Sequence, residues 1–376
     1  MKQYITIKPE HFNLVPSVFK DFQTEVFMDD IVGRDKVLFK TEEEKEELIK
    51  SLNNLNVKRV HCSYWAYPTS FITKNNFKEL IDRFGSIENV KEYYGDLSST
   101  FMFERWVSEY ILATSLDAQS YTFHLIDYAP IDGMWDFTIS KEDIRQAMIF
   151  MIQNFMNILL ERNLINENTP NIELENAGWG LEHGTQTSKD YISLFNQLYD
   201  PFDKVKIGWD INHLLHALGT YENNKACFYL PEVEITSDMK KMNDSINLIE
   251  TWLLENILDP SIVHKVGSIH LSDCTLKQVE YFSNGKLNEP YYTNIKNLET
   301  WNEKEEYGVN IVLKEYDNHL VIGSGCLSIS FVNKLINSLS SLNKDAVILH
   351  ELKNSLDLEK DIKTQYSLLD INKESL

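Results

Sequence analysis

The chain is short of cysteine and has no long hydrophobic run, and each absence excludes a class of protein. Its four cysteines, Cys62, Cys227, Cys274 and Cys326, are widely scattered and form no CxxC pair. This spacing excludes a zinc knuckle and a disulfide framework, and it favours a reduced, cytoplasmic setting. Because no stretch of about 18 consecutive apolar residues occurs, we also expect no membrane-spanning helix and no membrane partner.

The chain also has few basic residues relative to acidic ones, and its formal net charge at pH 7 is −21. A non-specific nucleic-acid binder carries a basic footprint that neutralises phosphates. A local site of metal ions can still hold a phosphate on an acidic protein. We therefore expect a small phosphorylated or sugar-containing substrate rather than bulk nucleic acid, and DNA stays open as an alternative.

What the chain does contain is a regular alternation of short apolar runs and helical stretches. Several of the runs are nearly continuous in apolar residues, which is typical of strands that are buried on both faces of a sheet. The runs interpreted as strands are Tyr4–Lys8, Glu25–Asp29, Lys58–Ser63, Ser120–Ile126, Asn171–Leu174, Lys204–Trp209, Lys265–Leu271 and Ala346–His350.

Helical patterns separate these runs. Apolar residues recur at helical spacing in Thr41–Leu55, which opens with a Thr cap, and in Lys141–Arg162, Thr187–Leu198 and Asp238–Leu258. Repeated strand–helix alternation predicts a (β/α)8 TIM barrel with long loops after strands 3 and 7. A doubly wound open sheet is the alternative fold. No linker or internal repeat interrupts the pattern, so residues 1–376 are interpreted as a single domain.

Side chains that bind metal ions recur at the ends of these apolar runs. In a (β/α)8 barrel, residues at the carboxyl ends of the strands face the active site, so positions far apart in the sequence converge there. Several carboxylates at one mouth would repel one another unless cations offset their charge. The candidate ligands are His61, His124, Glu175, Asp210, His213, His270, Asp317, His319 and Glu351.

The mixture of side chains indicates which metals fit. Imidazole and carboxylate ligands together suit zinc, manganese or iron(II), and the absence of thiolates disfavours a structural zinc site. The D-x-H spacing of Asp317 and His319 places both side chains on one side of an extended segment. A lone buried histidine is more often a hydrogen-bonded core residue than a ligand, so the prediction rests on the joint pattern.

Several motifs around these residues resemble a known family. The segments HCSYW, LENAGWG, DINH, HLSD and DNHLVIGSG are similar to motifs of the endonuclease IV branch of the xylose isomerase-like TIM barrels, the AP endonuclease 2 family. The resemblance covers most of the chain, at strand-end motifs rather than as continuous similarity. It implies up to three zinc ions and a ligand set for each of them.

The implied ligand sets divide the nine candidates among the three ions. His61 and His124 would hold the first zinc, and Glu175 would bridge it to the second. The second zinc would also be bound by Asp210, His270 and Glu351. The third would be held by His213, Asp317 and His319.

The resemblance also implies an activity. It predicts a metal-dependent hydrolase of phosphoesters that uses a zinc-bound hydroxide, with Glu175 or Glu351 orienting the nucleophile. The sugar isomerases and epimerases of the same superfamily share only the Glu175, Asp210, His270 and Glu351 set, with one metal. In that alternative, the two glutamates exchange a proton at a substrate carbon. A metal-binding or scaffolding barrel with a dead site is the third alternative.

Some segments depart from the family's pattern. The loop FMDDIVGRDKV is acidic where the DNA repair enzymes present polar and basic residues, and His350 competes with Glu351 as the ligand from the last strand. Substrate contacts are predicted at Tyr64, where the resemblance places a tyrosine, and at Trp179 and His183, which follow Glu175.

Overall fold

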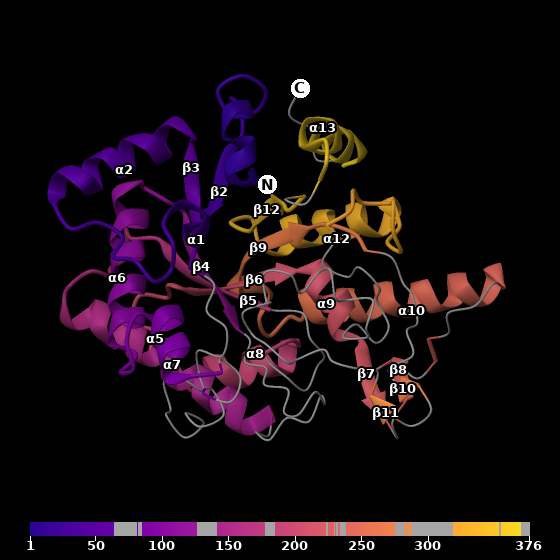
Figure 1. The fold of residues 1–376 in the computed structure, drawn as a ribbon. Coiled ribbons are helices and arrows are strands. Elements are labelled where there is room, and N and C mark those ends of the chain that lie inside the picture. The colour runs from indigo at the N-terminus through magenta and orange to yellow at the C-terminus, as the bar shows by residue number, and fades with distance from the viewer. Residues whose placement is uncertain are drawn as a thin grey trace.

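The computed structural model shows a closed barrel of parallel strands surrounded by helices (Figure 1). It describes residues 1–63, 81, 85–125, 141–176, 185–222, 225–228, 230, 232–233, 238–274, 282–283, 286–287, 319–352 and 355–369. Neighbouring strands pair in the order β1-β12-β9-β6-β5-β4-β3-β2, and β2 pairs with β1 to close the ring. The predicted (β/α)8 barrel is confirmed, and the open sheet is wrong.

The sequence predicts all eight barrel strands, with ends that differ from the structure by at most two residues. Two of the differences bear on the site. The second strand ends at Phe27, because a short helix begins at Met28, and the fifth strand continues to Asn176, so that Glu175 lies inside it. The barrel strands are β1 (Gln3–Ile7), β2 (Gln23–Phe27), β3 (Val57–His61), β4 (Ser120–Leu125), β5 (Asn171–Asn176), β6 (Val205–Asp210), β9 (Val266–Leu271) and β12 (Val347–His350).

Helices cover the outside of the barrel, and none of those in the described ranges is long and apolar enough to cross a membrane. Short hairpins, β7 (Gly219–Glu222) with β8 (Lys225–Phe228) and β10 (Phe282–Ser283) with β11 (Lys286–Leu287), were not predicted. The helices are α1 (Met28–Ile31), α2 (Glu42–Asn54), α5 (Ile87–Tyr94), α6 (Thr100–Ser115), α7 (Lys141–Glu161), α8 (Ser188–Phe195), α9 (Ile211–Ala217), α10 (Met239–Ile257), α12 (Ile329–Leu342) and α13 (Leu358–Leu368), with 3-10 turns at Pro9–Leu14 and Val263–Lys265.

Local signals explain where two of the helices begin and end. The side chain of Thr41 accepts a hydrogen bond from the backbone N–H of Glu44, so α2 has the predicted Thr cap. The helix expected over Thr187–Leu198 ends earlier, at Phe195. There the backbone N–H of Gln197 bonds to the carbonyl of Leu194, a tighter turn that terminates the helix.

The apolar core lies between the barrel and its helices. Trp106 of α6 and Phe155 of α7 pack edge-to-face on Phe123 of β4, with ring centroids 5.0 and 5.2 Å from the Phe123 ring. Each of these side chains is at most 2% exposed. Edge-to-face pairs of this kind add to the burial free energy of large rings, so α6 and α7 are held firmly against β4.

The interior of the barrel holds a charged layer instead of an apolar one. Arg59 of β3 is fully buried, and its Nε donates to Glu25 of β2 at 3.1 Å. Its two terminal nitrogens donate to the two carboxylate oxygens of Glu173 of β5, at 3.0 and 2.7 Å. One of them also donates to the hydroxyl of Ser268 of β9 at 3.1 Å. Strands β3 and β9 are not neighbours, so this contact crosses the barrel interior.

This layer makes the fold dependent on one arginine. Replacing Arg59 by Met leaves two buried carboxylates without their cation, so we expect the free energy of unfolding to fall by about 3–5 kcal/mol. Urea denaturation followed by circular dichroism measures it. The matched control is Arg162→Met, which breaks the half-exposed pair with Glu104 and is expected to change the free energy by about 1 kcal/mol or less. Equal effects of the two substitutions would contradict the prediction.

Candidate metal centre

The register of the barrel strands aligns the predicted ligands at one end of the barrel. His124 of β4 lies directly opposite Glu175 of β5, and Asp210 of β6 lies opposite His270 of β9. Asp210 is the last residue of its strand. Because parallel strands run in the same direction, these side chains meet at the carboxyl end of the barrel, where enzymes of this fold place their active sites.

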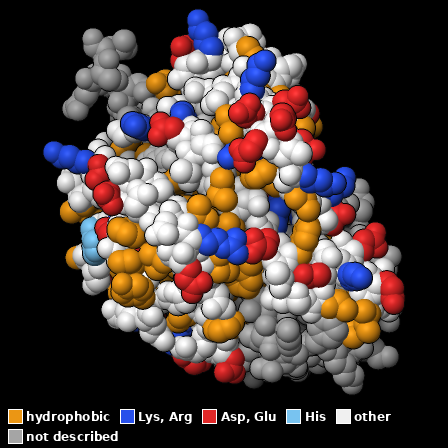
Figure 2. Space-filling view, turned by 90° about the vertical axis from the view of Figure 1, so that its left-hand side faces the viewer, with side chains coloured by type: hydrophobic (Ala, Val, Ile, Leu, Met, Phe, Trp, Pro, Cys, Tyr) orange, Lys and Arg blue, Asp and Glu red, His pale blue; other side chains and the backbone are white. Residues whose placement is uncertain are grey.

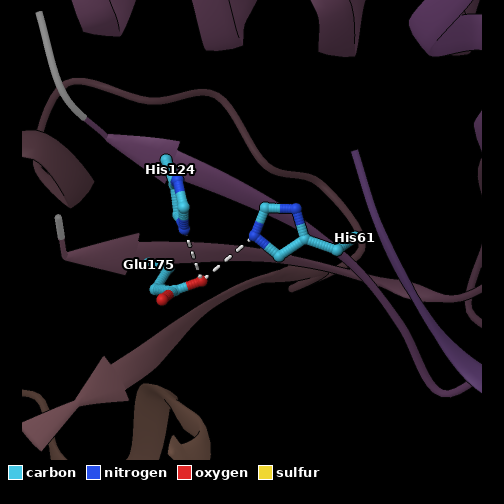
Figure 3. A group of neighbouring side chains, drawn as sticks. All are labelled: His61, His124 and Glu175. Atoms are coloured by element: carbon cyan, nitrogen blue, oxygen red, sulfur yellow. Dashed lines mark hydrogen bonds and ion pairs between the residues drawn. The ribbon is translucent and has the colours of Figure 1, made fainter. Parts of the chain in front are cut away.

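The first group of ligands consists of His61, His124 and Glu175. The Nε2 atoms of both histidines lie 3.3 Å from the same oxygen of Glu175, Oε2, and Figure 3 shows the two rings pointing toward it from neighbouring strands. The ring of Phe27 stacks on His61, with centroids 4.2 Å apart, and Nδ1 of His61 lies 2.9 Å from the carbonyl of Cys62. These contacts orient His61 with Nε2 toward the carboxylate.

The second group consists of Glu175, Asp210, His270 and Glu351. Nδ1 of His270 lies 2.9 Å from Oε2 of Glu351, 3.4 Å from Oε1 of Glu175 and 3.9 Å from Oδ2 of Asp210. Within each group, one ligand atom per residue lies within 4.8 Å of all the others. Glu175 belongs to both groups, so a single buried carboxylate joins them.

The remaining candidates lie beside these groups or outside the described residues. His213 occupies the first turn of α9, where its backbone N–H donates to Asp210 Oδ1 at 2.9 Å. Nδ1 of His213 lies 3.3 Å from Glu175 Oε1. The ring of His319 lies 6.5 Å from that of His213, measured between centroids. Asp317 lies outside the described residues, as do Tyr64, Trp179 and His183, so the third ligand set and the substrate contacts stay predictions.

The structure separates Glu351 from its competitor His350. Glu351 follows β12 and faces His270, whereas the His350 ring contacts Gln3 at 2.8 Å and Gln365 at 3.1 Å. His350 is part of neither ligand group among the described residues. Burial lowers the pKa of His350 to about 4, so it is a neutral hydrogen-bonded core residue.

Electrostatics tie the histidines to the carboxylates. Burial opposes a charged imidazole at His270, but the charges and hydrogen bonds of Glu175 and Glu351 outweigh it and raise the pKa of His270 well above its usual value. The pKa of His61 is raised in the same way, because the hydrogen bond and the charge of Glu175 outweigh the effect of burial. The pKa of His124 falls to about 4, because burial dominates there. The carboxylates therefore favour the protonated forms of His61 and His270.

The surroundings of two buried carboxylate oxygens indicate whether the site fits a cation. Oε1 of Glu175 and Oδ2 of Asp210 are buried, and among the described residues they have ion-pair contacts of 3.3–3.9 Å with His213 and His270 but no well-aligned hydrogen bond. Burial, followed by the charges of Glu351 and Glu175, raises the pKa of Asp210 to about 6. Buried carboxylate oxygens without well-aligned donors are costly unless a cation meets them. The donor set of imidazoles and carboxylates fits zinc, manganese or iron(II).

Two residues that were not predicted from the sequence, Asp273 and Asn176, hold the ligand-bearing segments. Both carboxylate oxygens of Asp273, which follows β9, accept hydrogen bonds from backbone N–H groups between Gly323 and Leu327. Asp273 also pairs with Leu320 through its backbone, which places His319 next to Ser272. The amide of Asn176 bonds to both backbone groups of Asp210. The only signal for these roles is their place in the HLSD and LENAGWG motifs.

Comparisons with known proteins agree on the fold. No protein-family profile and no curated protein sequence matches the chain. Among solved structures, endonuclease IV from Thermus thermophilus is similar with a TM-score of 0.52 and 10% identity, over 98% of each chain. A D-tagatose 3-epimerase-like protein is similar with a TM-score of 0.50 and 14% identity, over 100% of this chain and 99% of that one. Likeness at these identities shows a shared barrel fold.

The geometry makes a prediction about which residues bind metal. We expect Glu175→Gln to lose metal from both groups, because this carboxylate is common to them, and His124→Ala to lose metal from the first group alone. Metal content after dialysis against zinc, measured by mass spectrometry of the purified protein, distinguishes the two variants. His350→Gln is the control for Glu351→Gln, since only Glu351 faces the centre. Equal metal loss in those two variants would contradict the assignment.

The raised pKa of His270 predicts the direction of a pH dependence. A metal ion at Nδ1 displaces the proton that the surrounding carboxylates hold there, so proton and metal compete. Apparent metal affinity therefore rises with pH until the pH passes the pKa of His270, by up to about tenfold per pH unit for one displaced proton. Calorimetric titration with Mn²⁺ between about pH 6 and about pH 8 tests this. A flat profile would show that no proton is displaced.

Proposed function

We propose that the protein is a metal-dependent hydrolase of phosphoesters, with two or more divalent ions at the centre. The observation that carries the proposal is that Glu175 belongs to both ligand groups. A carboxylate shared in this way can bridge two cations, as two-metal phosphoester hydrolases require. A one-metal sugar isomerase needs only the second group and leaves His61 and His124 without a chemical role.

Zinc is the proposed metal, with up to three ions, and manganese or iron(II) are the alternatives. When bound, such ions polarise a phosphoryl oxygen and lower the pKa of an attached water molecule to near 7. The chain needs no separate lysine or histidine base for that chemistry. Nine ligands are proposed for the full centre, of which Asp317 supplies the ninth, from outside the described residues.

The proposed catalytic roles belong to Glu175 and Glu351. Both side chains are about 1% exposed, so bulk water is excluded from their carboxylates. Their charges are therefore weakly screened by solvent. We propose that they orient the attacking water molecule. Each carboxylate could accept a hydrogen bond from that water at the edge of the ligand cluster. His213 and His319 lie on the α9 side of Glu175, where we place the leaving oxygen.

The charge of the chain limits the size of the proposed substrate. Figure 2 shows one face of the molecule on which, among the residues drawn in colour, acidic and basic side chains are interspersed rather than gathered into a basic stripe. With a net charge of −21, long-range attraction to a polyanion is unfavourable. We therefore propose a small phosphorylated substrate in preference to bulk DNA.

A second candidate function is a sugar or sugar-phosphate epimerase or isomerase. The observation that favours it is the second ligand group, which by itself holds two glutamates, an aspartate and a histidine around one cation position. Glu175 and Glu351 would then exchange a proton at a carbon between two metal-bound substrate oxygens. This alternative also suits a small substrate.

Activity assays decide between the two functions. We expect the metal-loaded protein to hydrolyse an aryl phosphodiester or a small phosphomonoester, and Glu175→Gln to lower the rate at least about 100-fold. Arg162→Met, which breaks the half-exposed pair with Glu104, is the control and is expected to keep wild-type activity. An abasic-site duplex assayed in parallel reports whether DNA is also cut.

The opposite outcome is equally measurable. Incorporation of solvent deuterium into ketose or ketose-phosphate substrates, without release of phosphate from any ester, would replace hydrolysis by epimerisation. One bound metal per chain together with no phosphoester cleavage would reject the proposed function.

A further inference from the structure

The hydroxyl of Ser268 connects the charged layer inside the barrel to the candidate metal centre. The hydroxyl of Ser268 bonds to Arg59 and Glu173 below, and it lies 3.2 Å from Nε2 of His270 above. All four side chains are fully buried. Within the described residues, Ser268 is thus the hydroxyl that connects a structural ion pair to a proposed metal ligand.

Neighbouring glycines leave the space for this connection. A Cβ on Gly267 would lie 2.7 Å from Glu173 Oε1, closer than side-chain carbons approach such an atom. A Cβ on Gly208 would lie 3.4 Å from both Ser268 Oγ and His270 Nε2. The absence of a side chain at Gly267 therefore leaves room for the Glu173 carboxylate, whereas the distances at Gly208 are those of ordinary van der Waals contact.

Counting donors and acceptors settles the direction of each bond. The Arg59 guanidinium can only donate, and it occupies one lone pair of Ser268 Oγ at 3.1 Å. The Glu173 carboxylate accepts two bonds from Arg59, and it accepts the single hydroxyl hydrogen of Ser268 at 2.5 Å. One lone pair of the Ser268 oxygen remains. His270 Nε2 can form a hydrogen bond with this lone pair only as the donor. The Nε2 nitrogen therefore carries a hydrogen.

A hydrogen on Nε2 determines the state of Nδ1, on the opposite side of the imidazole ring. With its hydrogen on Nε2, a neutral His270 has the lone pair on Nδ1, which faces Glu351, Glu175 and Asp210. A neutral imidazole binds metal through its unprotonated nitrogen, and a hydrogen bond from the other nitrogen fixes the tautomer and the ring orientation.

We propose that Ser268, held by Arg59 and Glu173, is a positioning residue that keeps a hydrogen on Nε2 of His270 and so presents Nδ1 to a divalent metal ion. The metal half of this inference rests on the proposed function, in which His270 is a ligand. The tautomer half stands on the hydrogen-bond network alone. A hydroxyl that only stabilised the fold would leave the metal affinity of the folded protein unchanged.

Substitutions separate the two roles. Ser268→Ala removes the acceptor of His270, and we expect Zn²⁺ affinity, measured against a chromophoric chelator, to fall by about 10–100-fold. Ser268→Thr keeps the hydroxyl and should restore most of the affinity. Thr6→Val is the matched control, because the Thr6 hydroxyl bonds to Glu25 of the same layer, at 3.4 Å. It should keep wild-type affinity even if it lowers the unfolding temperature.

A measurement on the wild-type protein detects the hydrogen directly. In ¹⁵N-histidine-labelled protein, nuclear magnetic resonance reads whether Nε2 of His270 bears a hydrogen, with and without Zn²⁺, and a His270→Gln variant assigns the signal. A hydrogen on Nε2 in both states supports the role of Ser268. An Nε2 without hydrogen, or wild-type affinity in Ser268→Ala, overturns it. If the wild type does not bind Zn²⁺, both the role of His270 as a metal ligand and the proposed function are rejected. The Nε2 signal would still decide whether Ser268 keeps a hydrogen on Nε2 of His270.

Discussion

The buried carboxylate of Glu175 is the group on which the arrangement of this centre depends. Its Oε2 lies 3.3 Å from the Nε2 atoms of His61 and His124, and its Oε1 lies 3.3 Å from His213 and 3.4 Å from His270. A carboxylate with about 1% exposure is stable as an anion only if positive charge surrounds it. Neighbouring imidazoles surround it, and its negative charge raises the pKa of His61 and His270, which favours their protonated forms. The same cluster of imidazoles and carboxylates could hold a metal ion.

Two layers of ionisable groups share the barrel interior, and one supports the other. The lower layer is a structural network in which Arg59 satisfies Glu25 and Glu173. Directly above it lies the ligand cluster, and Ser268 joins the two. Apolar packing, which holds α6 and α7 on β4, is displaced to the outside of the barrel. This division lets the interior carry charge, because Arg59, Glu25 and Glu173 each have buried hydrogen-bond partners.

Much of the fold was predictable because each strand is a short apolar run with a helix after it. The clustering of the six residues in the two ligand groups was predictable for a related reason: in a parallel barrel, a polar side chain at a strand's carboxyl end faces the mouth. The choice between His350 and Glu351 was not, because an error of one residue in where the strand ends moves a side chain to the opposite face. The hairpin β7–β8 was also missed, since it pairs only with itself and leaves no signal in the barrel's pattern.

The sequence by itself therefore determined the eight strands, their order along the chain and the residues able to bind metal. Only the tertiary structure decided which carboxylate the two ligand groups share, and which charged residues are structural. Arg59 and Glu173 are 114 positions apart, and each looks in the sequence like a misplaced charge in an apolar strand. Periodicity reports which face of its own strand a residue occupies. It carries no information about a partner across the barrel, because that contact depends on closure and register of strands that never pair directly.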